Sequence, residues 1–132
     1  MNTNTGSTLE QEVKKTVESL IEHGTTYNVE KLNEIYDDSL KIVKIDELGN
    51  VEVLTKKATL DFFASKRTRG DEPLSKETVY NYVEADEHRG QVIVTRRMKM
   101  KDRPEKSIFS LHLEKKNGRW VIVRETAFVQ PE

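Results

Sequence analysis

Apolar residues in the first half of the chain recur with the three- and four-residue spacing of amphipathic helices. A first helix is predicted from about residue 9 to Gly24, and a second, shorter one after Asn28, a favourable N-cap residue. A third helix is predicted from Lys56 to about Arg67. The apolar positions of these helices are Leu9, Val13, Val17, Leu20, Ile21, Leu32, Ile35, Tyr36, Leu60, Phe63 and Ala64.

Elsewhere polar and apolar residues alternate, as they do in half-buried strands. Two short runs, 40–46 and 51–54, predict a hairpin, and four longer strands are predicted over roughly 77–86, 90–101, 107–116 and 119–129. Asn117-Gly118 is a strong hairpin signal, because a type I′ turn needs a positive φ at both of its central positions. This order predicts an α+β fold, with a curved, mixed or antiparallel sheet and three helices on its concave face.

The composition narrows the class of protein. The 132 residues predict one domain over residues 8–132, preceded by a flexible tail at residues 1–7. The net charge of −1 gives no overall field that would attract nucleic acid, a membrane or an anionic substrate, and the absence of cysteine excludes disulfides and thiolate chemistry. No apolar run approaches the ~18 residues of a membrane helix. Residues 1–7 lack the features of a signal peptide, so the protein is expected in the cytoplasm.

Two segments resemble a known superfamily. Residues 28–38 (NVEKLNEIYDD) are similar to the second helix of the nuclear transport factor 2-like (SnoaL-like) superfamily and to the acidic residues that follow it. Residues 118–123 (GRWVIV) are similar to the final strand of this superfamily. With the order of elements, the resemblance covers about residues 9–130. It implies a cystatin-like cone that encloses an apolar pocket and dimerises through the outer face of its sheet. The superfamily includes isomerases, dehydratases, polyketide cyclases and transport factors, so the resemblance selects no single activity.

Arg96 is a candidate for ligand binding because of its neighbours. It follows Val92 and Val94 on the apolar face of a predicted strand, where a guanidinium group needs an acceptor. A ligand carboxylate would serve, through two parallel hydrogen bonds. The alternatives are an internal salt bridge, for example to Glu125, and a solvated position at the end of the strand.

Strict alternation divides the final strand between two faces. Trp120 and Ile122 share one face with Arg124 and Thr126, and the resemblance to the superfamily implies that this face lines the pocket. Alternatively, the aromatic residues form ordinary core and Arg124 lies at the rim. The opposite face, expected to meet a partner subunit, carries Val121, Val123, Ala127 and Val129. The candidate ligand-binding residues are Tyr27, Tyr36, Phe63, Arg96, Trp120 and Arg124.

Two residues are weaker candidates for catalysis. His112 lies within a predicted strand and carries an imidazole, the side chain that most often acts as a general acid or base. The favoured alternative is a histidine that packs at the dimer face or is partly solvated. Asp46 ends the first strand, near the position of the general base in the resembling steroid isomerases, although its surroundings read as an ordinary turn. The three histidines are not spaced as metal ligands, and there is no phosphate-binding loop. No metal and no cofactor are therefore expected.

The prediction from the sequence is a homodimer that binds a small apolar or anionic molecule in its pocket. One alternative is an isomerase-, dehydratase- or cyclase-type enzyme acting on a small apolar carbonyl compound. Another is a dimeric protein-interaction module with a filled pocket. The basic run 96–103, with Lys66, Arg67 and Arg69, offers a possible RNA surface, but alternation splits it between faces. Neither a nucleic acid nor a membrane is expected as a partner.

Overall fold

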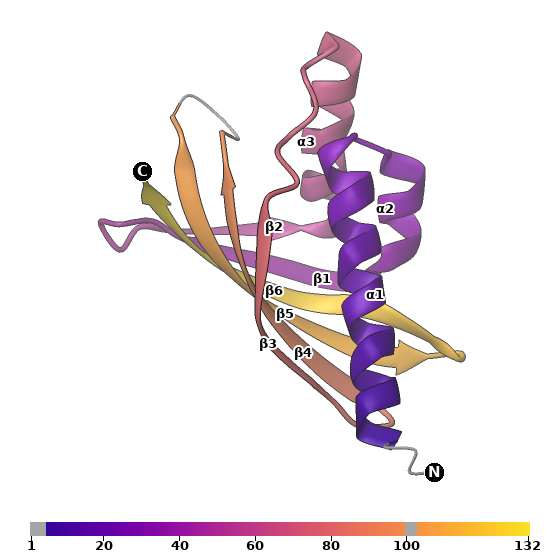
Figure 1. Ribbon diagram of the computed structural model, residues 1–132. Helices are drawn as coiled ribbons and strands as arrows, with labels where there is room; N and C mark the ends of the chain where they lie inside the picture. The colour runs from indigo at the N-terminus through magenta and orange to yellow at the C-terminus, as the bar shows by residue number, and fades with distance from the viewer. Residues whose placement is uncertain (1–4, 100–102) are drawn as a thin grey trace.

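The computed structural model describes residues 5–99 and 103–132, with side chains from residue 8 onward. The described part contains three helices and six strands in the predicted order (Figure 1). They are α1 (Thr5–Thr25), α2 (Val29–Ile35), β1 (Tyr36–Ile45), β2 (Val51–Thr55), α3 (Lys56–Arg69), β3 (Thr78–Ala85), β4 (Arg89–Met98), β5 (Glu105–Lys116) and β6 (Arg119–Pro131). Lys99 follows β4 outside any strand, and the last two residues of the predicted strand 90–101 lie outside the described residues.

Local chemistry explains where the helices begin and end. The Asn28 side chain accepts a hydrogen bond from the Lys31 amide (3.2 Å) and so caps α2, as predicted. The Thr55 hydroxyl accepts one from the Ala58 amide (3.2 Å) at the start of α3. This helix ends at Gly70, whose φ of 71° is a left-handed conformation that glycine adopts without strain. The first helix begins at residue 5, before its predicted start at about residue 9.

The six strands form one mixed sheet in the order β2-β1-β6-β5-β4-β3. All neighbours are antiparallel except β1 and β6, which run parallel. The β5–β6 hairpin turns at Asn117 (φ 52°) and Gly118 (φ 78°), as predicted for a type I′ turn. Tyr36, predicted on the second helix, instead begins β1 and pairs with Ile122 of β6. The strand therefore starts before the predicted residue 40, because β6 offers it a partner.

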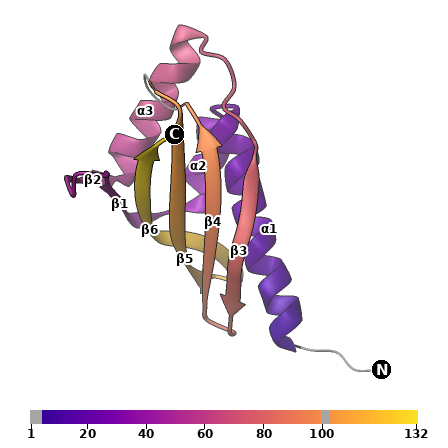
Figure 2. The ribbon, with the colours of Figure 1, turned by 60° about the vertical axis from the view of Figure 1, so that its left-hand side comes forward.

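The helices cover one face of the sheet (Figure 1). The first helix packs on β3, β4 and β6, while α3 packs on β1 and β2 at the other end of the same face. In Figure 2 the strands β4, β5 and β6 stand in front of the helices, and none of the described helices covers their outer side. No helix within the described residues has the length and apolar character needed to cross a membrane.

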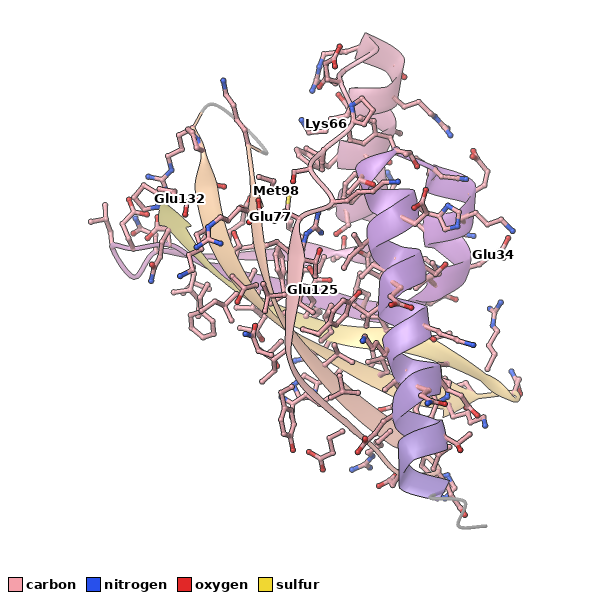
Figure 3. All side chains as sticks on the ribbon, in the orientation of Figure 1. Glu34, Lys66, Glu77, Met98, Glu125 and Glu132 are labelled. Atoms are coloured by element: carbon pink, nitrogen blue, oxygen red, sulfur yellow. The ribbon has the colours of Figure 1, made fainter. Side chains whose placement is uncertain are left out.

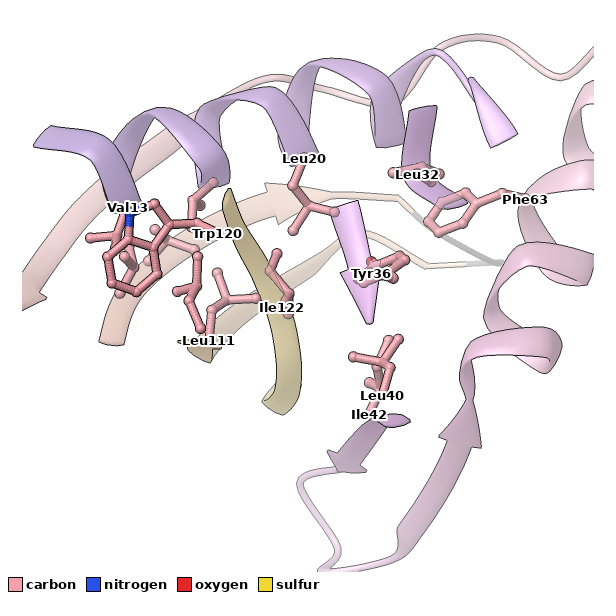
Figure 4. Close-up of a cluster of buried hydrophobic side chains, with 14 of the residues drawn as sticks. Val13, Leu20, Leu32, Tyr36, Leu40, Ile42, Phe63, Leu111, Trp120 and Ile122 are labelled. Carbon is pink, nitrogen blue, oxygen red and sulfur yellow. The ribbon is translucent and has the colours of Figure 1, made fainter. Parts of the chain in front are cut away.

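The hydrophobic core lies between the sheet and the helices (Figure 4). Val13 and Val17 of α1 meet Val92 of β4 and Ile122 of β6 in this layer, and all four are fully buried. Burying each such side chain contributes roughly 1.5–3 kcal/mol relative to leaving it exposed. The core therefore holds α1 against the strands that also shape the interior cavities.

Two described arginines of the basic run 96–103, Arg97 and Arg103, form ion pairs within the protein. The Arg97 guanidinium contacts the carboxylates of Glu132 (2.6 Å) and Glu77 (3.3 Å). Arg103 contacts Glu47 (2.8 Å) and Glu105 (3.0 Å). Residues 100–102 lie outside the described part of the chain. In these ion pairs the positive charges of Arg97 and Arg103 are neutralised by neighbouring glutamates.

Candidate functional site

A β-bulge in β6 determines which of its side chains reach the interior. The pairing with β5 shifts register between Ile122 and Arg124, which leaves Val123 as an extra residue. Alternation therefore reverses at Val123, so that Glu125 is buried and Arg124 is exposed. The prediction that Arg124 faces the pocket is wrong, because strict alternation does not allow for the extra residue.

The same bulge corrects two further assignments on β6. Ala127 and Val129, predicted on the outer face, both line an interior cavity. Thr126, predicted inward, pairs with Ser110 and Val43 on the outer side of the sheet. The inner face of the second half of β6 is thus formed by Glu125, Ala127 and Val129.

Glu125 is the most unusual side chain of the interior. It is 6 % exposed, and its carboxyl group has no hydrogen-bond or ion-pair partner among the described residues. Burial raises the pKa of Glu125 to about 7, although the positive charges of Lys44 and Arg96 oppose the rise. Figure 3 shows Glu125 near the middle of the molecule, between the sheet and α1.

Two small cavities adjoin Glu125. The first, here called the α1 cavity, has a volume of about 80 Å³ and is bordered by Leu20, Ile21 and other residues of α1. The second, the α3 cavity, has a volume of about 70 Å³ and is bordered by Thr59 and Phe62 of α3. Most of their walls are apolar. The residues that border both cavities are Tyr36, Phe63, Met98, Phe109 and Glu125.

Arg96 borders the α1 cavity and is 7 % exposed. Its guanidinium donates through Nε to the Glu77 carbonyl (3.2 Å) and through Nη2 to the Ser75 carbonyl. No carboxylate of the described residues lies within ion-pair distance of it, so the salt bridge to Glu125, one of the alternatives to ligand binding, is not formed. Burial lowers the pKa of Arg96, but a guanidinium remains charged in proteins. The site therefore contains a buried cation that two backbone carbonyls hold in place.

Tyr36 and Phe63 lie where the sequence suggested, on the walls of the interior. Tyr36 is 5 % exposed, and its hydroxyl group makes no hydrogen bond to the described residues. Burial, and then the negative charge of Glu125, raise the pKa of Tyr36 well above its ordinary value. Tyr36 thus stays protonated and presents a free donor beside Glu125.

Tyr27 and Trp120 have structural roles away from the two cavities. The Tyr27 hydroxyl donates to the Glu72 carbonyl (2.6 Å) and so ties the connection between α1 and α2 to the loop before β3. The Trp120 indole donates to the Glu12 carboxylate (2.8 Å). In Figure 4 Trp120 lies beside Val13, at the opposite end of the core from Phe63. Neither residue borders the α1 cavity or the α3 cavity.

The two catalytic candidates also lie outside the cavities. His112 is exposed on the outer face of β5, with its Nε2 atom 3.5 Å from the Ser110 hydroxyl. The Asp46 carboxylate accepts hydrogen bonds from the amide (2.9 Å) and the side chain (3.1 Å) of Asn50 and from the amide of Leu48 (2.9 Å), and these lower its pKa. Asp46 is therefore the turn residue of the alternative interpretation.

The outer face of the sheet carries exposed apolar residues. One row crosses four strands through the pairs Val51–Ile45, Ile45–Phe128 and Phe128–Ile108. Val51, Phe128 and Ile108 are 60 %, 47 % and 39 % exposed, respectively. The pair Val43–Val53 lies beside this row on the same face. A contiguous apolar surface of this kind is typical of an interaction site.

From the sequence, Glu125 is expected only as a possible partner for Arg96 and not as a site residue. The signal that could have found it is its spacing from Ala127 and Val129, because a lone acid within an alternating apolar stripe is costly to bury. Among the described residues, no three histidine, aspartate or glutamate side chains gather as metal ligands.

Comparison with known proteins supports the fold. No protein-family model matches the chain, and no curated protein matches its sequence. The structure nevertheless resembles solved structures over most of its length. An NTF2-like protein of unknown function from Shewanella baltica superposes with a TM-score of 0.78 at 11% identity, over 99% of this chain and 100% of that one. An NTF-2-like protein of unknown function from Silicibacter pomeroyi gives 0.72 at 13% identity, over 90% and 93% of the two chains.

Two further solved structures have a similar fold. An NTF2-like protein from Rhodospirillum rubrum, described as of unknown function in nutrient uptake, gives a TM-score of 0.70 at 21% identity, over 89% of this chain and 97% of that one. A protein of unknown function with a cystatin-like fold, from Nostoc punctiforme, gives 0.67 at 9% identity, over 92% and 91%. Together with the strand order and the helix-covered face, these likenesses show that the chain has the NTF2-like fold.

Proposed function

We propose that this protein binds a small, mainly apolar molecule in the α1 and α3 cavities. The observation that carries the proposal is Glu125, which is nine-tenths buried, borders both cavities and has no partner among the described residues. An unpaired buried acid costs stability, so its presence in an otherwise apolar wall favours a functional role. Tyr36, which borders both cavities and whose hydroxyl has no hydrogen-bond partner among the described residues, supplies a second polar group.

The volumes favour a ligand no larger than one ring or a short chain. Each cavity has about half the volume of the ~150 Å³ apolar cavity that is known to hold benzene. Met98 borders both cavities, and its unbranched side chain moves between rotamers readily. A rearrangement of Met98 would join the cavities into one site of suitable size for such a ligand.

Filling the α3 cavity is expected to weaken ligand binding. Ala127 lines this cavity and is fully buried, whereas its neighbour Thr126 lies on the outer side of the sheet. Ala127→Leu should therefore weaken binding of hexanamide or cyclohexanone by tenfold or more, a loss of about 1.4 kcal/mol or greater. Saturation-transfer NMR measures the binding, and Thr126→Leu is the matched control.

Equal binding by both variants would place the ligand elsewhere and contradict the proposal. If Ala127→Leu does not fold, Val129→Phe tests the same cavity from its other border. No binding of either compound by the unsubstituted protein would also count against the proposal.

A second candidate function is proton transfer at a small carbonyl compound. The observation that favours it is the pairing of a carboxyl group whose pKa is about 7 with a free tyrosine hydroxyl. A carboxyl poised near neutral pH is suited to general acid–base chemistry. The cyclohexanone samples, prepared in deuterated water, report this activity as exchange of the protons next to the carbonyl, which Glu125→Gln should stop.

We further propose that two copies of the chain associate through the outer face of the sheet. An apolar patch is complementary to itself, so a second copy related by a two-fold axis matches it. Phe128 lies within the row of apolar residues, with Ile108 and Ile45 as its cross-strand neighbours.

A charge in the middle of this row is expected to prevent association. Phe128→Glu should convert the dimer to a monomer, because a buried carboxylate without a partner is costly. Light scattering coupled to size-exclusion chromatography measures the mass. Leu48→Glu introduces the same charge at a residue that is 79 % exposed in the β1–β2 turn, and it should leave the dimer intact. A monomeric parent protein, or a dimer that survives Phe128→Glu, would refute the proposed interface.

A further inference from the structure

Arg96 presents the interior with a positive charge that no described carboxylate neutralises within ion-pair distance. Its Nε and Nη2 atoms are used by the carbonyls of Glu77 and Ser75, while its Nη1 atom makes no hydrogen bond to the described residues. The guanidinium is thus held in position by the backbone and keeps donors free at the border of the α1 cavity. A guanidinium group that is held in position and has free donors is suited to binding a planar anion such as a carboxylate.

The other charged and titratable groups that border the two cavities determine the net charge of the interior. Tyr36 and Lys44 come from β1, and Glu105 comes from β5. Glu105 is paired with Arg103 (3.0 Å), whereas Lys44 forms no ion pair with a described residue. The side chains that α1 and α3 contribute to the cavity walls are uncharged.

When Glu125 is protonated, the interior therefore carries the charges of Arg96 and Lys44 with no unpaired negative charge. When Glu125 is ionised, its charge opposes them. A second carboxylate brought into the same cavity would repel an ionised Glu125, and two carboxylates at close range do not both stay ionised. A protonated Glu125, by contrast, offers an O–H donor beside that of Tyr36.

We propose that the ligand is a small monocarboxylate with an apolar tail, whose carboxylate is held by Arg96 while Glu125 takes up a proton from solvent. This inference rests on the proposed function, since it assigns the ligand class of the same cavities. The apolar tail would lie among the leucine, methionine and phenylalanine side chains of the walls. The ligand remains an anion, and the proton is bound by the Glu125 carboxylate, so charge and atoms balance.

The test compares three ligands that share one tail, namely hexanoate, hexanamide and hexylamine. Hexanoate is expected to bind most tightly near pH 6.5, and above pH 7 its affinity should fall by roughly tenfold per pH unit, because each unit costs about 1.4 kcal/mol in proton binding. Hexanoate itself stays ionised throughout, since carboxyl groups in water titrate near pH 4 to 5. Hexanamide should bind more weakly and without this dependence, and hexylamine should not bind.

Glu125→Gln is the decisive variant, since the amide keeps the shape of the protonated acid. It should bind hexanoate with the same affinity near pH 6.5 and near pH 8.5. Glu52→Gln, at an exposed position on β2, should retain the original pH profile. Arg96→Gln should lose hexanoate but keep hexanamide. If loss of the carbonyl contacts prevents this variant from folding, the Glu125→Gln profile still decides the question.

Calorimetry measures independently how many protons are taken up when the ligand binds. Near pH 8, hexanoate binding measured in two buffers of different ionisation enthalpy should show uptake of close to one proton per ligand. The same experiment with Glu125→Gln should show none.

The outcomes separate this inference from the proposed function. Binding of hexanamide with no preference for hexanoate would overturn the inference and leave the proposed function in place. Preferential binding of hexylamine, or hexanoate binding that does not depend on pH, would also overturn it. Failure of all three ligands to bind would overturn both.

Discussion

Replacing Glu125 with glutamine is expected to stabilise the folded protein increasingly as the pH rises from about 4.5 to 7. In the folded chain the pKa of Glu125 is about 7, compared with its ordinary value of 4.5. The difference of about 2.5 pH units corresponds to about 3 kcal/mol in the free energy of unfolding. Glutamine stays neutral at every pH and therefore does not incur this cost.

The direction of this pH dependence follows from which state of the chain, folded or unfolded, binds the Glu125 proton more tightly. The folded chain holds the Glu125 proton to a higher pH than the unfolded chain does. Ionisation between the two pKa values therefore favours unfolding, so the wild-type stability falls over this range and the loss is complete above pH 7. Below pH 4.5 both states are protonated, and this contribution disappears.

Urea unfolding at a series of pH values measures the effect. The stability difference between Glu125→Gln and the wild type should be near its minimum at pH 4 and larger by about 3 kcal/mol at pH 8. The matched control is Glu52→Gln, whose side chain is exposed. A stability difference for Glu125→Gln that is constant across the series would show that this carboxyl group is not desolvated in the folded protein.

The second large effect is expected at Gly90, in the strand that faces α1. A Cβ atom at this position would lie 2.7 Å from Cγ1 of Val13 and 3.3 Å from the Glu84 carbonyl. Val13 is fully buried and β-branched, so it has little freedom to move aside. Gly90→Ala should therefore destabilise the protein by about 2 kcal/mol, although alanine normally suits a strand better than glycine.

A double-mutant cycle tests the stated cause. Val13→Ala removes the atom that collides, so the combined variant should lose less stability than the sum of the two single variants. Gly24→Ala provides the control, because its new Cβ atom would meet nothing within 4 Å and α1 favours alanine. Exact additivity, or an unchanged stability of Gly90→Ala, would mean that the helix and the strand are not in such close contact.

The parts of the fold that the sequence predicts correctly depend on local chemistry. Asn28 caps α2, and the glycine of the Asn117-Gly118 turn has the positive φ that the motif requires. Each feature depends on residues that are only a few positions apart, so a short segment of the sequence is enough to predict it. The order of helices and strands follows from such signals.

The features that the sequence did not reveal depend on pairing between distant segments. The bulge at Val123 arises where β6 is paired with β5, and it exchanges the faces of Arg124 and Glu125. The start of β1 at Tyr36 depends on the parallel contact with β6. The acceptors of Arg96 are carbonyls of the segment before β3, which carry no residue-specific signal. These three features together produce the candidate site.

The central claim is that an unpartnered carboxyl group borders the interior cavities, and a carbon-13 NMR titration of the Glu125 side chain tests it most directly. The resonance is assigned by its absence from the spectrum of Glu125→Gln. The expected midpoint is close to 7. A midpoint near 4.5, the ordinary value for glutamate, would contradict the claim, because it would mean that the carboxyl group is solvated or already paired.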